Sequence, residues 1–131
     1  IAAAFDGNTN QAHAACASKN NVVAQNGYVG KTPGGAWALD YAVVYGSNSL
    51  GFCGTNPSAT LTIYGKNGVP ASGTDGTVLG SITFTDTANE SAGRTVTIAD
   101  KYTTYTSLWV HLTQPDNTDN RIAELQLYGW T

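Results

Sequence analysis

Apolar and polar residues alternate along much of this chain with a period of two. The clearest example is WALDYAVVY, residues 37–45, in which the odd-numbered residues from Trp37 to Tyr45 are all large and apolar or aromatic. The run stops at GSN, residues 46–48, a sequence typical of turns. Because successive side chains of a strand point to opposite faces, residues 37–45 are predicted to form a strand followed by a turn.

Three shorter segments show the same period. Leu61 and Ile63 indicate a strand that ends at GKNG, whose Asn-Gly step is a strong turn signal. In ITFT, residues 82–85, two apolar residues alternate with threonines, which predicts a strand with its threonines outward. Residues 96–98, VTI, predict a further strand.

The segment SLWVHLT, residues 107–113, differs because both of its faces carry residues that favour burial. Two leucines and a valine occupy one face, while Trp109 and His111 occupy the other. A strand that is apolar on both faces is typical of the centre of a sheet. We therefore expect this strand to be central, with His111 as a packed strand residue.

The last segment, RIAELQLYGW, residues 121–130, places a carboxylate within an otherwise ordinary strand. Ala123, Leu125 and Leu127 alternate on one face, so Glu124 starts on the other. The strand leaves a polar loop, QPDNTDN, that could help to hold a cation.

Composition sets the class of fold. The chain has 131 residues, of which only 11% are charged, and it is rich in Gly, Thr, Ser and Asn. This length suits one domain, residues 1–131, and no sustained helical periodicity or internal repeat divides it. Short strands joined by many turns predict an all-β sandwich or barrel.

The opening sequence FDGNTNQ places several oxygen-bearing side chains around a glycine-permitted turn, among them Asp6, Asn8 and Gln11. Hard cations such as calcium bind six to eight oxygen ligands from carboxylates, amides and backbone carbonyls. This loop and Glu124 are therefore candidate partners in one calcium site.

The pairing of a DGN loop with a terminal AEL strand resembles the discoidin, or coagulation-factor C-type, superfamily of galactose-binding-like domains, which includes many carbohydrate-binding modules. The resemblance implies a jelly-roll β-sandwich with a structural calcium. It carries over at Asp6 and at Glu124, whereas Gln11 stands where these modules often have threonine. The ligands expected from the resemblance and the loop are Asp6, Asn8, Gln11, Ala123 and Glu124.

The order of YGSNSLGF, LTIYGKNG, DGTVLGSITFTDT and SLWVHLTQP is similar to a compact subgroup of discoidin-like domains found in phage and related bacterial particles. That resemblance implies a location outside the cell or on the surface of a virion-like particle. If the domain binds glycans, the affinity of each site should be weak, so display in several copies on a larger protein or particle would matter.

Cys16 and Cys53 are the two cysteines of the chain, and no metal-binding or redox spacing surrounds them. If they form a disulfide, the bridge contributes about 3 to 4 kcal/mol in the chain-entropy model and the protein belongs in an oxidising compartment. If they remain thiols, each is a small buried hydrophobe. The sequence leaves both alternatives open.

Sugar recognition usually combines an aromatic face with a few rigid polar groups. Tyr102 and Tyr105, in DKYTTYTS, are the aromatic candidates, and each has the alternative of capping the sandwich. Arg94, in ESAGRT, offers a planar fork of donors, or it is a surface charge. His13 and Asn20 lie in polar runs that are either ligand contacts or ordinary solvated loops.

Several classes of function are not indicated. The net charge of −3 and the scattered Lys and Arg residues argue against nucleic-acid binding. No apolar stretch is long enough to predict membrane insertion, and IAAAFDG does not have the pattern of a secretory signal. The familiar nucleophile, nucleotide and zinc motifs are absent from the sequence, and the aspartates occur in turn sequences, so we expect no enzymatic activity.

The sequence thus predicts a non-catalytic, lectin-like module that binds glycans or cell-surface polysaccharide through loops at one end of a β-sandwich. The alternative is a structural or adhesion module of a phage-like particle or cell surface, which acts through protein–protein contacts. Fold alone does not separate the two, because function depends on the site.

Overall fold

The computed structural model describes residues 16–18, 26–46, 52, 58–85, 93–113 and 120–131, and all regular structure in these ranges is β-strand. The strands are β1 (Cys16–Ser18), β2 (Asn26–Lys31), β3 (Ala38–Tyr45), β4 (Ala59–Lys66), β5 (Thr77–Phe84), β6 (Arg94–Thr97), β7 (Ser107–Thr113), β8 (Asn120–Arg121) and β9 (Glu124–Trp130). The all-β prediction is confirmed. No helix in this part of the chain is long and apolar enough to cross a membrane.

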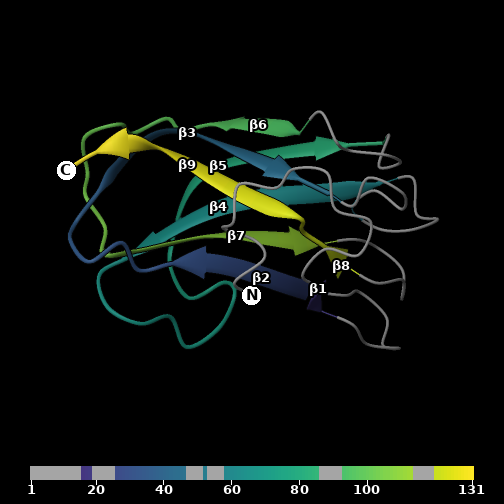
Figure 1. Ribbon diagram of the computed structural model, residues 1–131, viewed down its shortest axis with the longest axis horizontal. Coiled ribbons are helices and arrows are strands. Elements are labelled where there is room, and N and C mark those ends of the chain that lie inside the picture. Colours follow the sequence, from purple (N-terminus) through teal and green to yellow (C-terminus); the bar gives the residue numbers. More distant parts are fainter. Residues whose placement is uncertain (1–15, 19–25, 47–51, 53–57, 86–92, 114–119) are drawn as a thin grey trace.

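The strands form two larger antiparallel sheets that pack face to face (Figure 1). One sheet has the order β2-β7-β4-β5, the other has the order β6-β3-β9, and β1 pairs with β8 separately. The fold is therefore a β-sandwich, as expected, and not a barrel. The strand SLWVHLT is β7, between β2 and β4, so its predicted central position is confirmed.

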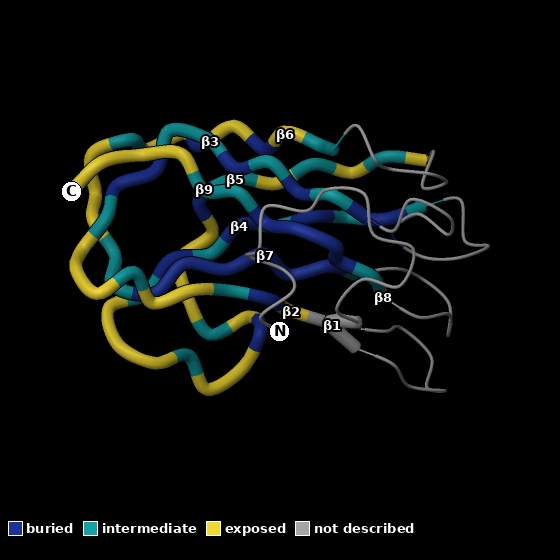
Figure 2. Tube along the Cα trace, viewed as in Figure 1, coloured by how far each residue is buried: buried dark blue, intermediate teal, exposed yellow. Residues whose placement is uncertain are grey.

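The core lies between the two sheets, as the dark blue segments of the inner strands show (Figure 2). In β4 the burial alternates strictly, with Ala59, Leu61 and Ile63 inside and the threonines between them partly exposed. In β5 Ile82 and Phe84 are partly buried while Thr83 is exposed, so the threonines do face outward. These two strands follow the period that the sequence indicated.

Strand β3 departs from the predicted single face. Leu39 is buried, but the next inward residues are Ala42 and Val44, while Tyr41 and Tyr45 are only partly buried on the outer face. The pairing of β3 with β9 shifts register between Leu39 and Tyr41. A bulge of this kind adds one residue to a strand and so exchanges its two faces, which alternation alone does not reveal.

The two sheets are joined along the side where β5 and β6 meet. The amide of Ala99 donates to the carbonyl of Leu79 at 3.3 Å. A side chain on Gly80 would collide with the backbone oxygen of Thr97. Glycine at position 80 thus permits the close approach of the two edge strands.

Candidate functional site

Glu124 and Arg94 lie at the same end of the sandwich, where β3 ends. In the register of the three-stranded sheet, Glu124 pairs with Tyr45 and Arg94 pairs with Val44. Glu124 is 4% exposed, and the amide of its neighbour Ala123 donates to the carbonyl of Tyr45 at 2.7 Å. The strand therefore holds a carboxylate in a buried position, which is unfavourable unless a charge partner or hydrogen bonds compensate it.

Arg94 is the first residue of β6, and its guanidinium lies over the ring of Phe84, 4.5 Å from the ring centroid. A cation over an aromatic face is held in place by the ring quadrupole and by packing. Arg94 is half-buried at the rim of the sandwich. The local structure thus restricts the orientation of a fork of donors at this end.

Tyr102 and Tyr105 lie at the opposite end, beside the start of β3. The backbones of Tyr105 and Trp37 exchange two hydrogen bonds of 2.9 Å, and the Tyr105 ring packs against the core. Tyr102 is 86% exposed. The structure does not bring these tyrosines together with Arg94. Arg94 begins β6 beside the end of β3, and the chain after β6 leads to the start of β3, where Tyr105 pairs with Trp37 (Figure 1).

The turn that carries Tyr102 is organised by Asp100. One oxygen of this carboxylate accepts hydrogen bonds from the amides of Tyr102 at 2.9 Å and Thr103 at 3.2 Å, and the other accepts one from the Thr103 hydroxyl at 2.5 Å. The hydroxyl bond, followed by the amide bonds, lowers the pKa of Asp100 below its ordinary value. The turn is a structural feature that presents Tyr102 to solvent.

Several predicted residues lie outside the described ranges, namely Asp6, Asn8, Gln11, His13, Asn20 and Cys53. Cys16 begins β1, where its backbone pairs with Arg121. The calcium ligands of the opening loop and the disulfide therefore stay predictions. Among the described residues no three His, Cys, Asp or Glu side chains form a metal-binding group.

The outer face of the four-stranded sheet holds an aromatic cluster that the site prediction missed, made by Tyr28, Tyr64, Trp109 and His111. The rings of Tyr64 and Trp109 stack at 5.6 Å with an interplanar angle of 9°, and His111 meets Tyr64 edge-on at 6.1 Å. Trp109 and His111 are buried although they face away from the core. The sequence SLWVHLT already indicated this buried outer face, because both of its faces carry residues that favour burial.

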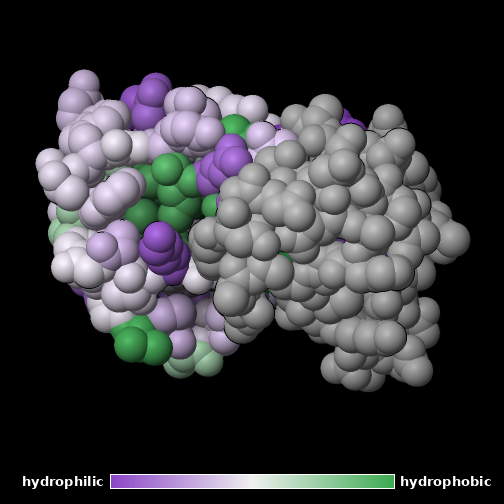
Figure 3. Space-filling model, viewed as in Figure 1, coloured by the Kyte–Doolittle hydropathy of each residue, from purple (hydrophilic) through white to green (hydrophobic). Residues whose placement is uncertain are grey.

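A second feature is an apolar hollow between the edge strands β2 and β9, of about 180 Å³. Trp37, Leu125 and Leu127 line it together with Pro33 and Lys31. Figure 3 shows apolar side chains within a hollow of the visible face. This opening gives access to the space between the sheets, at the side opposite to β5 and β6.

The fold is shared with known carbohydrate-related proteins, although no family model and no curated protein matches the sequence. A GH29 fucosidase from Ruminococcus gnavus, solved with fucose, has a TM-score of 0.60 at 14% identity over 97% of this chain. A fucolectin from striped bass (Morone saxatilis) serum has a TM-score of 0.59 at 14% identity over 96%. The C-terminal domain of a chitobiase from Bacteroides fragilis has a TM-score of 0.50 at 17% identity over 80%.

This chain covers only part of each of these proteins: 21% of the fucosidase, 40% of the fucolectin and 64% of the chitobiase domain. At such low identities the likeness shows that the β-sandwich fold is shared. It does not by itself transfer a binding site, because the same fold can carry different functions.

Proposed function

We propose that this chain is a non-catalytic, discoidin-like carbohydrate-binding module that recognises glycans at the end of the sandwich where Arg94 and Glu124 lie. The observation that carries the proposal is the guanidinium of Arg94, held on the Phe84 ring 4.5 Å from its centroid at that end. Support also comes from the fold, which is shared with a fucolectin, a fucosidase and a chitobiase domain, all named for carbohydrate.

The physical basis is pre-organisation. A free arginine side chain loses rotamer freedom when it binds a ligand, whereas Arg94 is already restrained by Phe84. Its planar fork can donate paired hydrogen bonds to vicinal hydroxyls or to a sugar carboxylate. Binding to one sugar unit is weak in such sites, so display in several copies on a larger protein or particle would raise avidity.

Calcium belongs to the same proposal. Glu124 supplies a carboxylate that is only 4% exposed, and Ala123 precedes it on a buried stretch of chain. A divalent cation would offset the cost of burying this carboxylate. The remaining oxygen ligands would come from Asp6, Asn8 and Gln11 of the opening loop, with the cation acting on stability and not as a sugar contact.

Glycan array screening followed by titration of two matched variants tests the proposal. Fucose-containing glycans are the first probes, because two of the structural neighbours are named for fucose. Arg94→Ala should weaken binding at least tenfold, as expected when about 1.4 kcal/mol or more is lost. Tyr102→Ala, a change to an 86% exposed residue at the opposite end, is the control and should leave binding unchanged.

Two results would contradict the proposal. Weaker binding in Tyr102→Ala but not in Arg94→Ala would move the site to the other end of the sandwich. No binding to any glycan, together with stable self-association, would favour the alternative of a structural or adhesion module. Thermal unfolding of each variant should accompany the titrations, so that a loss of fold is not mistaken for a loss of contact.

A further inference from the structure

The outer face of the four-stranded sheet is divided into two unlike halves. On β4 and β5 it carries paired hydroxyls, with Thr60 and Thr83 joined at 2.8 Å and Thr62 and Ser81 joined at 3.0 Å. Such pairs are ordinary for a solvent-facing sheet. On β2 and β7 the same face carries Tyr28 opposite His111 and Gly30 opposite Trp109. Within the described residues, another part of the chain lies over this second half.

The covering segment is the β4–β5 loop, residues 67–76. Its Gly73 carbonyl accepts a buried 2.8 Å hydrogen bond from the Trp109 indole Nε1. A side chain at Gly73 would come within 2.8 Å of the Tyr28 ring and 2.9 Å of the His111 ring. The loop therefore lies directly on the aromatic cluster, at a distance that only glycine permits.

The loop is also fixed at its base. Lys66 and Asp75 form an ion pair of 2.5 Å, and the Ala71 amide donates to the same Asp75 oxygen at 2.7 Å. These contacts, led by the hydrogen bond from Lys66, lower the pKa of Asp75. A loop tied at several points forms a pre-shaped wall, which reduces the ordering cost of binding a ligand.

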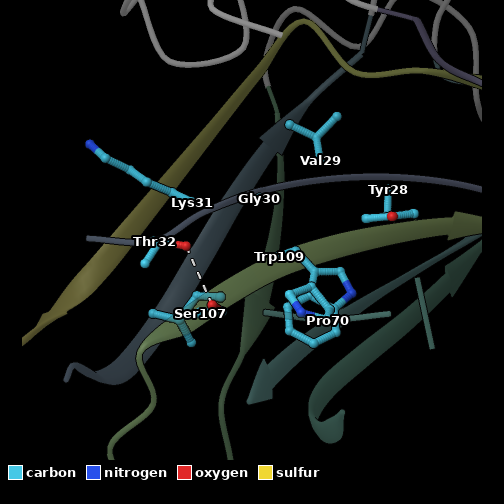
Figure 4. A pocket seen from close by; sticks show the side chains of 9 residues that line it. Tyr28, Val29, Gly30, Lys31, Thr32, Pro70, Ser107 and Trp109 are labelled. Atoms are coloured by element: carbon cyan, nitrogen blue, oxygen red, sulfur yellow. Dashed lines mark hydrogen bonds between the residues drawn. The ribbon is translucent and has the colours of Figure 1, made fainter. Parts of the chain in front are cut away.

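Two cavities open where this loop meets the sheet, with Tyr28 lining both. The larger, of about 310 Å³, is lined by Tyr28, Ser72, Gly73, Thr74 and His111. The smaller cavity, of about 190 Å³, lies beside Tyr28, Pro70 and Trp109. Figure 4 shows the rings of these three residues around it, with the hydroxyls of Thr32 and Ser107 nearby. Tyr28 is 43% exposed, so part of its ring is accessible to a ligand.

The lining of the larger cavity defines the ligand that would fit. The described residues that line it supply one phenol ring, the hydroxyls of Ser72 and Thr74 and an imidazole, and none of them carries a carboxylate, an ammonium or a guanidinium group. Burial lowers the pKa of His111, which favours the neutral ring that can both donate and accept. An ionic ligand would find no counter-charge among these described lining residues, whereas a ring with an apolar face and several hydroxyls would find a partner for each part.

We propose that this cavity is a second binding site, on the flank of the sandwich, for a single neutral pyranose ring. The apolar face of the sugar packs on Tyr28, and its hydroxyls bond to His111, Ser72 and Thr74. The volume of about 310 Å³ is at the low end of the roughly 300–1,000 Å³ typical of small-molecule sites, which fits one ring. The site is separate from the Arg94 end and does not depend on it.

NMR titration of the ¹⁵N-labelled protein with neutral methyl glycosides tests the proposal. Methyl glucoside, galactoside, mannoside and fucoside keep the ring closed and carry no charge. At least one should shift the amide signals of Ser72, Gly73 and Thr74 and the indole signal of Trp109, with a dissociation constant on the order of 1 to 10 mM. Cyclohexanol, a ring with a single hydroxyl, should bind at least tenfold more weakly.

The variants separate this site from the proposed end site. Tyr28→Ala should raise the dissociation constant measured from the signals of residues 72–74 at least tenfold. The signals near Arg94 should still respond to the glycan that binds at the end site. Tyr28→Phe keeps the ring and should retain binding. Tyr102→Ala is the exposed-tyrosine control and should change nothing. The Trp109 indole signal in each variant without sugar reports whether the loop stays in place.

The proposal is overturned if no glycoside shifts the loop signals, if cyclohexanol binds as well as the sugars, or if the shifts persist in Tyr28→Ala. If only the proposed site near Arg94 were wrong, the result would differ: sugars would not shift the signals near Arg94, but they would still shift the signals of residues 72–74.

Discussion

The outer faces of the two sheets both carry aromatic side chains but differ in how far these side chains are exposed to solvent. On the four-stranded sheet, Trp109 is 1% exposed because the loop of residues 67–76 lies over it. On the three-stranded sheet, the rings of Tyr41 and Tyr128 stack at 4.4 Å and 12°, yet Tyr128 stays 41% exposed and Trp130 45% exposed. Figure 2 shows the corresponding contrast, with β7 buried and the end of β9 exposed.

The difference shows what a covering loop contributes. A stacked pair on an open face is worth about 0.5–1.5 kcal/mol beyond its buried area. A fully covered tryptophan contributes several kcal/mol, and its cover creates concave surface where a ligand can bind. The three-stranded sheet thus keeps exposed aromatic rings on its outer face, while the covered part of the four-stranded sheet has become a small second core with cavities at its margin.

The largest expected effect comes from removing the covered ring. Trp109→Ala should lower the free energy of unfolding by about 3 to 5 kcal/mol, because it leaves a cavity and frees the Gly73 carbonyl that the indole bonds. Trp130→Ala on the open face is the matched control and should cost about 0.5 kcal/mol or less. Urea denaturation measures both, and equal losses would remove the distinction between the two faces.

A smaller effect on stability is expected at one end of the three-stranded sheet, where Glu124 pairs with Tyr45. If the proposed calcium stabilises this end, saturating metal should add about 2.7 kcal/mol when free calcium is a hundredfold above its dissociation constant. Excess chelator should then lower the melting temperature. Glu124→Gln should remove most of that response, and an unchanged melting temperature with chelator would disprove the calcium site.

The smallest expected effect is a dependence of the free energy of unfolding on pH, which arises from His111 on the covered face of the four-stranded sheet. Burial lowers the pKa of His111 in the folded protein below that of the unfolded chain. The unfolded chain therefore binds the proton first, so stability falls as the pH decreases through about 6.5 and levels off below the folded-state pKa. Unfolding free energies between about pH 7.5 and 5.5 should show this slope.

His111→Gln should flatten that slope, whereas His13→Gln, which changes the other histidine of the chain, should keep it. A slope that persists in His111→Gln would mean that the covered face is not the source of the acid sensitivity.

Much of the fold could be predicted from periodicity because half-buried strands repeat every two residues. Strand β4 and most of β5 follow this rule in the structure, whereas β7 is buried on both faces, as its sequence indicated. Strand β2, NGYVGK, was not foreseen, since two glycines and one buried valine give too little alternation. The face of β3 was misassigned because its bulge leaves no mark in the pattern.

The candidate site was harder to predict, because residues that are close in the sequence of an extended chain can lie far apart in space. Arg94 and Tyr102 are eight positions apart, but a strand advances roughly 3.3 Å per residue, so β6 and the chain after it carry them to opposite ends. Conversely, Tyr28, Gly73 and His111 are remote in sequence and meet only because β2 pairs with β7 and a loop folds back. Such contacts depend on topology and not on local pattern.

The junction between β5 and β6 has a consequence for how the sandwich can open. The Ala99 amide bonds to Leu79 of the other sheet, and the adjacent Ile98 amide bonds to Asp40 of β3 at 3.1 Å. These two neighbouring protons therefore report on different events in hydrogen exchange. Exchange at Ala99 requires the sheets to part along this side, whereas exchange at Ile98 requires only that the chain after β6 detach from β3. The ratio of the two rates measures how often the whole sandwich opens relative to local fraying of one edge strand.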